Sequence, residues 1–241
     1  MSIQDSRRAI RHLLDERSPA DAPTAYYALH HPAARTALFV EQDAGGRVVG
    51  FAARCLTGLD LFRPLVTLRG PSPEVAARLL GEALTAGRPY IVFVAADQYP
   101  LVGGSVQVES ERLLHIYRLD RARFQPVINV LVTQERAPDG LPRFPVRIGG
   151  EVQAAAGINW QSPDFAEIYV HVTPRARGRG FGRSVVAACT ERVLQSERTP
   201  LYLVEPDNEA SRALADGVGY VDTVARQVYA EAIYTGKPLG G

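Results

Sequence analysis

Short extended runs of hydrophobic residues alternate along this chain with runs of helical spacing. Phe165–Val172 is an extended stretch, and compact apolar runs occupy residues 88–94 and 199–205. Hydrophobic residues recur with a helical period over Glu74–Leu84 and Ser184–Gln195. Strands interleaved with helices predict a protein of the α/β (α+β) class, with mixed β-sheets and flanking helices.

The order of these elements occurs twice. Glycine pairs at Gly45-Gly46 and Gly149-Gly150 each separate two extended apolar segments, which predicts a hairpin in each half. A helical run and a strand follow in both copies, which close near Tyr117 and Tyr229. The matched positions are offset by 104 residues early and by 111 to 112 later. We predict two modules, in which about 36–117 superpose on about 140–229, and convergence of two unrelated α/β modules is the alternative.

The division between the modules falls in a charged connector over residues 118–125, which predicts domains over 1–122 and 123–241. Further elements are predicted outside the repeat: helices over 6–17 and 23–31, a strand over Val127–Val132 and a loop over Gln134–Pro145.

A glycine-rich turn links the strand that ends at Val172 to the following helical run. Such a turn directs free backbone N–H groups and the positive end of a helix dipole to one point, which favours a phosphate. Four cations without an acid accompany it, namely Arg175, Arg177, Arg179 and Arg183. The pattern predicts a pyrophosphate site, and a surface turn rich in glycine and arginine is the alternative.

The glycine spacing excludes two common nucleotide motifs. Glycines stand at positions 178, 180 and 182, which does not match the G-x-G-x-x-G turn of dinucleotide-binding folds. A nucleoside-triphosphate loop needs Gly-Lys-Ser/Thr, and the one lysine of the chain is Lys237.

The string V-x-P-x-x-R-G-x-G-x-G resembles the acyl-CoA loop of the GNAT superfamily of N-acyltransferases. The R/Q-x-x-G-x-G/A pattern of that family falls on Arg177, Gly180 and Gly182, and the resemblance is specific over about residues 146–229. It implies acetyl-CoA as co-substrate, with its pantetheine arm where strands Glu167–Val172 and Leu201–Val204 splay apart. The cofactor-binding residues that it implies are Val170, Val172, Arg177, Gly178, Arg179, Gly180, Gly182, Arg183 and Asn208. Asn208 is also a candidate helix N-cap.

The same resemblance implies catalytic residues. An amine acceptor must lose a proton before it attacks a thioester, and Glu167 occupies the strand where some GNAT members carry a catalytic glutamate. An exposed strand carboxylate is the alternative, because the spacing from Glu167 to Val172 is one residue shorter than in the family, which a bulge would restore. The usual acid, a tyrosine, corresponds to Ala215 here, and Tyr169 is the candidate substitute.

The first module lacks the loop chemistry. Pro71 and Pro73 remove backbone donors that a phosphate needs, and Glu74 at a helix start repels an anion. We therefore expect a degenerate GNAT-like N-terminal half without its own cofactor, whose role is to wall an acceptor pocket.

Composition and charge limit the kinds of partner that this protein is expected to bind. A net charge of +1 argues against a nucleic-acid-binding surface, and the apolar runs are too short to span a membrane. Two cysteines, without metal-ligand spacing, and charges from Asp5 onward lead us to expect a cytoplasmic protein without a metal. The expected partner is a small-molecule or peptide amine, and a homodimer stays open.

Three functions follow from these features. An acetyl-CoA-dependent N-acetyltransferase is favoured, and a non-catalytic acyl-CoA-binding sensor or pseudoenzyme is the alternative that Ala215 keeps open. A structural protein with a vestigial loop is disfavoured, because the glycine-arginine set is intact.

Overall fold

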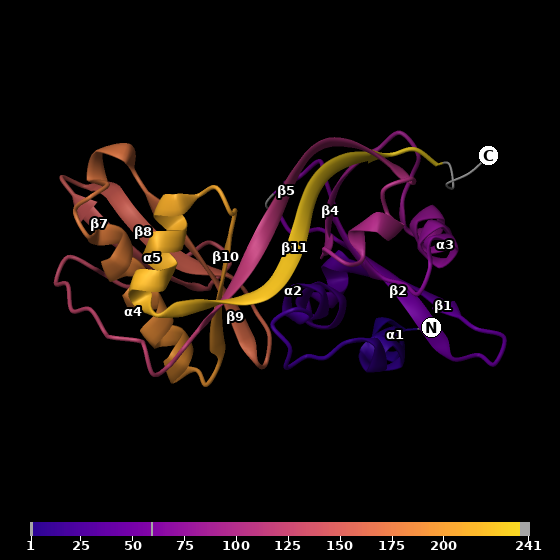
Figure 1. The fold of residues 1–241 in the computed structure, drawn as a ribbon, viewed down its shortest axis with the longest axis horizontal. Coiled ribbons are helices and arrows are strands. Elements are labelled where there is room, and N and C mark those ends of the chain that lie inside the picture. Colours follow the sequence, from indigo (N-terminus) through magenta and orange to yellow (C-terminus); the bar gives the residue numbers. More distant parts are fainter. Residues whose placement is uncertain (1, 59, 237–241) are drawn as a thin grey trace. The chain divides into compact units, whose positions relative to one another are not determined.

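The computed structural model describes residues 2–58 and 60–236, which divide into two compact units. Unit 1 consists of residues 1–114 and 225–241, and unit 2 consists of residues 115–224. Strands form mixed sheets with helices against them in both units (Figure 1). The α/β class that the sequence predicts is therefore confirmed.

Unit 1 contains a hairpin, a third strand, a helix and a fourth strand, namely β1 (Thr36–Gln42), β2 (Val48–Cys55), β3 (Leu65–Arg69), α3 (Pro73–Ala83) and β4 (Pro89–Ala95). The pairs β1–β2 and β2–β3 are antiparallel, whereas β3–β4 is parallel. Helix α3 begins after Ser72, whose hydroxyl oxygen accepts a hydrogen bond from the Val75 N–H. Its apolar residues Leu79 and Leu80 are buried in the core of this unit.

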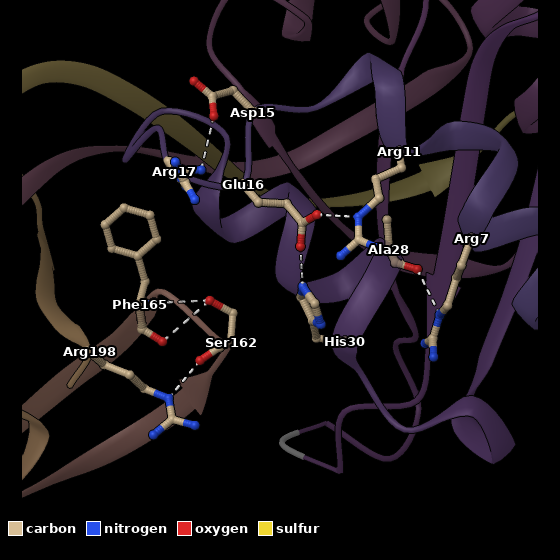
Figure 2. Close-up of polar contacts among 10 residues, drawn as sticks. All are labelled: Arg7, Arg11, Asp15, Glu16, Arg17, Ala28, His30, Ser162, Phe165 and Arg198. Carbon is tan, nitrogen blue, oxygen red and sulfur yellow. Dashed lines mark hydrogen bonds and ion pairs between the residues drawn. The ribbon is translucent and has the colours of Figure 1, made fainter. Parts of the chain in front are cut away.

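The N-terminal helical segment of unit 1 differs in its bounds from the two predicted helices. Helix α1 (Ile3–Ile10) ends in a 3-10 turn (Arg11–Leu13), and α2 (Ala22–Ala25) continues as a π turn (Tyr26–His30). The Glu16 carboxylate lies between them, with Oε1 2.5 Å from Arg11 Nε and Oε2 2.7 Å from His30 Nε2 (Figure 2). These charge-assisted contacts hold the irregular segment between the two helices.

Unit 2 repeats this order of elements, and its second strand, third strand and helix are longer than those of unit 1. Its strands and helices are β7 (Pro142–Ile148), β8 (Glu151–Gln161), β9 (Phe165–Val172), α4 (Phe181–Gln195), β10 (Thr199–Val204) and α5 (Glu209–Val218). The pairs β7–β8 and β8–β9 are antiparallel, and β9–β10 is parallel. Gly149 and Gly150 both have positive φ in the β7–β8 turn, as a two-residue hairpin of type I′ requires. The two predicted hairpins are therefore confirmed.

Two hydrogen bonds of Ser162 hold the start of β9. The Ser162 hydroxyl oxygen accepts from the Phe165 N–H at 3.1 Å, and Arg198 Nε donates to the Ser162 carbonyl at 2.6 Å (Figure 2). The core behind β9 consists of buried residues of the sheet and of α4, including Ile168, Val185 and Cys189.

The strand predicted over Val127–Val132 is wrong. Only Val132 makes a bridge, to Val146, and the residues before it are irregular. The Asn129 side chain turns the backbone, because its Oδ1 accepts from the Leu131 N–H at 3.0 Å. The loop predicted over Gln134–Pro145 is also partly wrong, since it contains β6 (Glu135–Arg136) and the start of β7.

Two long strands contribute residues to both units. Strand β5 (Val106–Leu119) belongs to unit 1 up to Leu114, and its residues 115–118 pair antiparallel with β10 in unit 2. Residues 227–233 of β11 (Tyr220–Tyr234), drawn in yellow in Figure 1, pair antiparallel with β4 in unit 1. Each unit thus takes a closing strand from the other sequence repeat. The boundary at 122/123 describes the repeats and stays a prediction, whereas the compact units divide the chain at other positions.

Candidate functional site

Strands β9 and β10 separate after three residue pairs. Their parallel register runs from Thr199 opposite Phe165 to Leu201 opposite Glu167, and no pair follows. On its other side β9 stays paired with β8 as far as Val172. Beyond Glu167, therefore, the β9 edge that faces β10 has backbone groups without a strand partner. The predicted splay between these strands is confirmed.

The glycine turn after β9 leads directly into the N-terminus of α4. Gly178 and Gly180 have φ of 74° and 75°, a backbone conformation that glycine adopts without strain. Gly180 is the N-cap of α4, no side chain caps this end, and the first turn contains no acid. The first helical N–H groups are therefore available to a ligand. The helix begins at Phe181, three residues earlier than the sequence predicts.

A pocket of about 390 Å³ lies at this turn. Its lining includes two arginines and no carboxylate, and consists of Val170, Val172, Ala176, Arg177, Gly178, Gly180, Phe181, Gly182, Arg183, Asn208, Ala210, Ser211 and Leu214. The structure thus brings together all the predicted cofactor-binding residues except Arg179. The guanidinium of Arg179 lies over the Phe181 ring, 4.8 Å from its centroid.

Close packing explains a third glycine of the turn. A Cβ at Gly182 would lie 3.2 Å from Val172 Cγ2 and 3.4 Å from Leu214 Cδ2. Glycine at this position therefore allows α4 to lie close to β9 and to α5. Residues of these three elements line the pocket. Asn208 serves as the N-cap of α5, because its Oδ1 accepts from the Ser211 N–H at 3.1 Å. Its amide N–H₂ stays available for other partners.

Glu167 lies where the two strands begin to separate. It is the last β9 residue paired with β10, and its half-buried side chain accepts a hydrogen bond from Asn159 Nδ2 at 2.9 Å. Burial raises the pKa of this carboxyl group to about 7, and contacts with the side chains of Asn159 and Trp160 oppose that shift. Because strand residues alternate, Glu167 projects from the face opposite to the core residues Ala166 and Ile168.

The bulge that would restore the spacing from Glu167 to Val172 is not found in β9. Strand β9 pairs without interruption over these residues, and the extra residue is Asn159 in β8, between Ile158 and Trp160. The bulge residue is also the hydrogen-bond donor to Glu167. A bulge therefore does affect this carboxylate, but through the neighbouring strand.

Tyr169 is not brought to the pocket. Its ring crosses Gly157 on β8, where an added Cβ would lie 2.6 Å from the Tyr169 hydroxyl. Burial raises the pKa of this hydroxyl, and Arg143 on β7 opposes the shift. The side chain therefore extends toward β8 and β7, whereas the splay opens on the β10 side of β9.

Residues 147–229 match the FR47-like protein family. No curated protein matches the chain. Among solved structures, a tandem GNAT protein from the clavulanic acid biosynthesis pathway has a TM-score of 0.59 and 15% identity, over 99% of this chain and 96% of that one. The chain has a tandem GNAT fold.

Two further structures cover nearly all of this chain. A GCN5-related N-acetyltransferase from Kribbella flavida has a TM-score of 0.60 and 14% identity, over 91% of this chain and 96% of its own. A Drosophila protein has a TM-score of 0.67 and 13% identity, over 98% of this chain and 96% of its own. At these identities the likeness establishes the fold, and the resemblance that the sequence indicates is confirmed at that level.

The corresponding loop of the first GNAT-like repeat is closed by protein groups. Ser72 caps α3, and Glu74 stands in its first turn. The Gly70 N–H donates to Gln98 Oε1 at 3.0 Å, and Arg69 forms an ion pair with Asp21. Hydrogen-bond acceptors of the protein thus occupy the backbone N–H groups that an anion would use, and a carboxylate neutralises the nearby arginine. The expected lack of a cofactor in this half remains a prediction with this support.

The local sequence does not indicate two hydroxyl groups that meet near the pocket of the second repeat. Tyr202 Oη lies 2.7 Å from Ser211 Oγ, and Ser211 lines the pocket. Ala215, one turn later on α5, is fully buried in the core and does not line the pocket. Ser211 follows Asn208 by three residues, but no local pattern connects it with a tyrosine on β10.

None of the described helices is long and apolar enough to cross a membrane. No group of three or more His, Cys, Asp or Glu in the described part of the chain could hold a metal ion.

Proposed function

We propose that this protein is an N-acetyltransferase that transfers the acetyl group of acetyl-CoA to a primary amine. The observation that carries the proposal is the carboxylate-free pocket where β9 and β10 separate, bounded by the glycine turn and the uncapped start of α4. Solved structures described as acetyltransferases share the fold, which supports an acyltransferase of this kind. The acceptor is a small molecule or a peptide with an amino group.

Different residues of unit 2 bind different parts of acetyl-CoA. The N–H groups at the start of α4, with the guanidinium groups of Arg177 and Arg183, hold the pyrophosphate. The unpaired edge of β9 at Val170 and Val172 receives the pantetheine arm as a neighbouring strand would. Bound acetyl-CoA supplies an activated acyl group with a good leaving thiolate.

Glu167 supplies the base. An alkylamine has a pKa of about 10 and is protonated at neutral pH, so that it must lose a proton before it attacks. A carboxyl group with a pKa of about 7 is partly ionised at that pH and accepts the proton more readily than an ordinary glutamate. Its place at the vertex of the splay supports this role.

Arginine substitutions in the loop test the binding site. Arg177→Gln and Arg183→Gln each remove a cation of the pocket lining, and loss of a charge-assisted hydrogen bond of about 1.5–3 kcal/mol weakens acetyl-CoA binding by about tenfold or more. Arg175→Gln is the matched control, because this exposed residue of the same turn does not line the pocket. Equal dissociation constants for the parent and all three variants would refute the site.

A non-catalytic acyl-CoA sensor is the second candidate. It is favoured by one observation, the buried methyl group of Ala215 where a GNAT enzyme would be expected to carry its acidic tyrosine. Release of free thiol from acetyl-CoA in the presence of amines separates the two candidates, because a sensor binds acetyl-CoA without consuming it.

A further inference from the structure

A buried tyrosine and a serine meet at the wall of the pocket. Tyr202 on β10 is 2% exposed, and its hydroxyl oxygen lies 2.7 Å from Ser211 Oγ. Ser211 is half-buried in the first turn of α5 and lines the pocket with Val170 and Val172 of β9. The pair thus joins the interior of unit 2 to the space where the acyl-CoA arm is proposed to lie.

The partners available to the two hydroxyl groups determine which of them donates the hydrogen bond. Ser211 Oγ is the one partner that the structure gives the Tyr202 hydroxyl within the described residues. If Ser211 donated, the tyrosine proton would remain buried without an acceptor, which is costly. If Tyr202 donates, its proton is satisfied and the Ser211 proton is free to point into the pocket. Burial also raises the pKa of the Tyr202 hydroxyl, so that it stays protonated and remains a donor.

We propose that the Ser211 hydroxyl, oriented by Tyr202, donates a hydrogen bond to the sulfur of acetyl-CoA as the thiolate leaves. The inference rests on the proposed function and adds a residue to it. Ser211 is a catalytic residue in this account, because it contacts the reacting sulfur. Tyr202 acts through Ser211 and is a positioning residue.

The chemistry of the step is favoured by such a donor. Glu167 first takes a proton from the ammonium and passes it to solvent. The amine nitrogen then forms a bond to the thioester carbon and gives its second proton to Glu167, and the C–S bond breaks with its electron pair on sulfur. The developing negative charge lies in a pocket without a carboxylate, where a fixed O–H dipole stabilises it. Ser211 keeps its proton, and the thiolate, with a pKa of about 8.5, takes one from water after release.

Removal of either hydroxyl group tests the proposal. Ser211→Ala should lower kcat for thiol release from acetyl-CoA by about tenfold or more, the low end for a lost hydrogen bond to a charged group, with the Kd for acetyl-CoA unchanged. Tyr202→Phe should lower kcat by a smaller factor, because Ser211 keeps its hydroxyl but loses its orientation. Ser211→Thr retains the hydroxyl and should restore most of the kcat.

A second buried tyrosine provides the matched control. Tyr220 Oη lies 2.8 Å from Thr190 Oγ1 in the core of the same unit, and neither residue lines the pocket. Tyr220→Phe removes a similar buried hydroxyl group and should leave kcat at the parent value. A general loss of stability would reduce kcat in this variant as well.

The outcomes separate this inference from the proposed function. Acetyl-CoA binding without any change of kcat in Ser211→Ala overturns the inference alone. A parallel loss of kcat in Tyr220→Phe overturns it too, because the effect is then structural. A parent that binds acetyl-CoA but releases no thiol with any amine or water overturns both the inference and catalysis, and a parent that does not bind acetyl-CoA refutes the proposed function itself.

Discussion

At the scale of single residues, the protonation of Glu167 links stability with the catalysis that we propose. Burial raises the pKa of this carboxyl group to about 7, although Asn159 donates a hydrogen bond to it. A carboxylate that titrates near neutral pH is a better proton acceptor than one with an ordinary pKa, but its charge is costly to keep in the folded protein. Opposite effects on turnover and on stability are therefore expected when the charge is removed.

Replacement of Glu167 by glutamine should lower turnover about a hundredfold or more, the usual loss for a general base, with the Kd for acetyl-CoA unchanged. In the parent, kcat should rise with pH through about 7, because the carboxylate form is the base. The variant should lack this rise. Glu151→Gln, at the exposed start of β8, is the control. Unchanged turnover of Glu167→Gln on an accepted amine would show that Glu167 is not the base.

The same substitution should stabilise the fold at alkaline pH. The folded state holds the Glu167 proton up to about pH 7, whereas the unfolded state releases it near the ordinary value of 4.5, so that stability is lost as pH rises between these values. A glutamine is neutral throughout. Thermal unfolding at about pH 8 should therefore show a higher midpoint for Glu167→Gln than for the parent, and the difference should vanish near pH 4. A lower midpoint for the variant at pH 8 would contradict the raised pKa.

Local patterns predicted most of the site residues, and tertiary contacts account for the rest. A strand, spaced glycines and a helix lie next to one another in the chain, so that the turn over residues 177–183 could be interpreted from sequence alone. The position of Tyr169 over Gly157 depends on the register between two strands. The contact of Tyr202 with Ser211 depends on how α5 packs, which no sequence spacing encodes.

At the scale of elements, β9 is held on one side and open on the other. Its pairing with β8 extends to Val172, whereas its pairing with β10 stops at Glu167. A strand fixed along one edge keeps the other edge extended and ready for a ligand backbone. The packing of β8 against β9 should therefore matter for the pocket although β8 does not line it.

Gly157→Ala tests this packing. The added Cβ would lie 2.6 Å from the Tyr169 hydroxyl and 2.7 Å from two ring atoms, so that overpacking should cost about 1–3 kcal/mol in urea unfolding. The double variant with Tyr169→Ala should lose much less from the glycine change. Gly217→Ala is the control, because nothing lies within 4 Å of an added Cβ on this helix and alanine should stabilise it by about 0.5–1 kcal/mol. Equal effects of the two alanines would show that β8 tolerates a side chain.

The prediction of elements was wrong in segments where side-chain hydrogen bonds, and not the hydrophobic pattern of the sequence, determine the backbone conformation. Residues 127–132 have the composition of a strand, but Asn129 accepts a hydrogen bond from the Leu131 N–H and donates to Ser184 Oγ on α4 at 3.0 Å. These contacts replace strand pairing. Glu135 likewise bonds Arg143 and Arg147, which orders part of a segment that its prolines and glycine predict as a loop.

At the scale of the whole molecule, the sequence repeats and the compact units do not coincide. The predicted order of elements is present in both units, but unit 2 begins within β5 at His115, where four residues pair with β10. A sequence repeat reveals the order of the elements. It does not reveal which of the two sheets a closing strand pairs with. The long strands β5 and β11 decide this through pairing that sequence spacing leaves open.

Fragments of the chain distinguish the two divisions. Residues 115–224 contain the strand that closes β10, and they should fold and bind acetyl-CoA. Residues 123–241 follow the sequence repeat but lack that strand, which leaves a row of unpaired backbone groups on β10. This fragment should be poorly folded, as circular dichroism and thermal unfolding would report. A well-folded fragment 123–241 beside an unfolded fragment 115–224 would favour the boundary at 122/123.

Titration calorimetry of the full chain with acetyl-CoA tests the central claim most directly. The account predicts one equivalent bound per chain, weakened by Arg183→Gln in the pocket of unit 2 and unaffected by Arg78→Gln on α3 of unit 1. Saturation at about 100 times the dissociation constant should also raise the free energy of unfolding by roughly 2.7 kcal/mol. Two equivalents per chain, or no binding at all, would contradict a single acyl-CoA site where β9 and β10 separate.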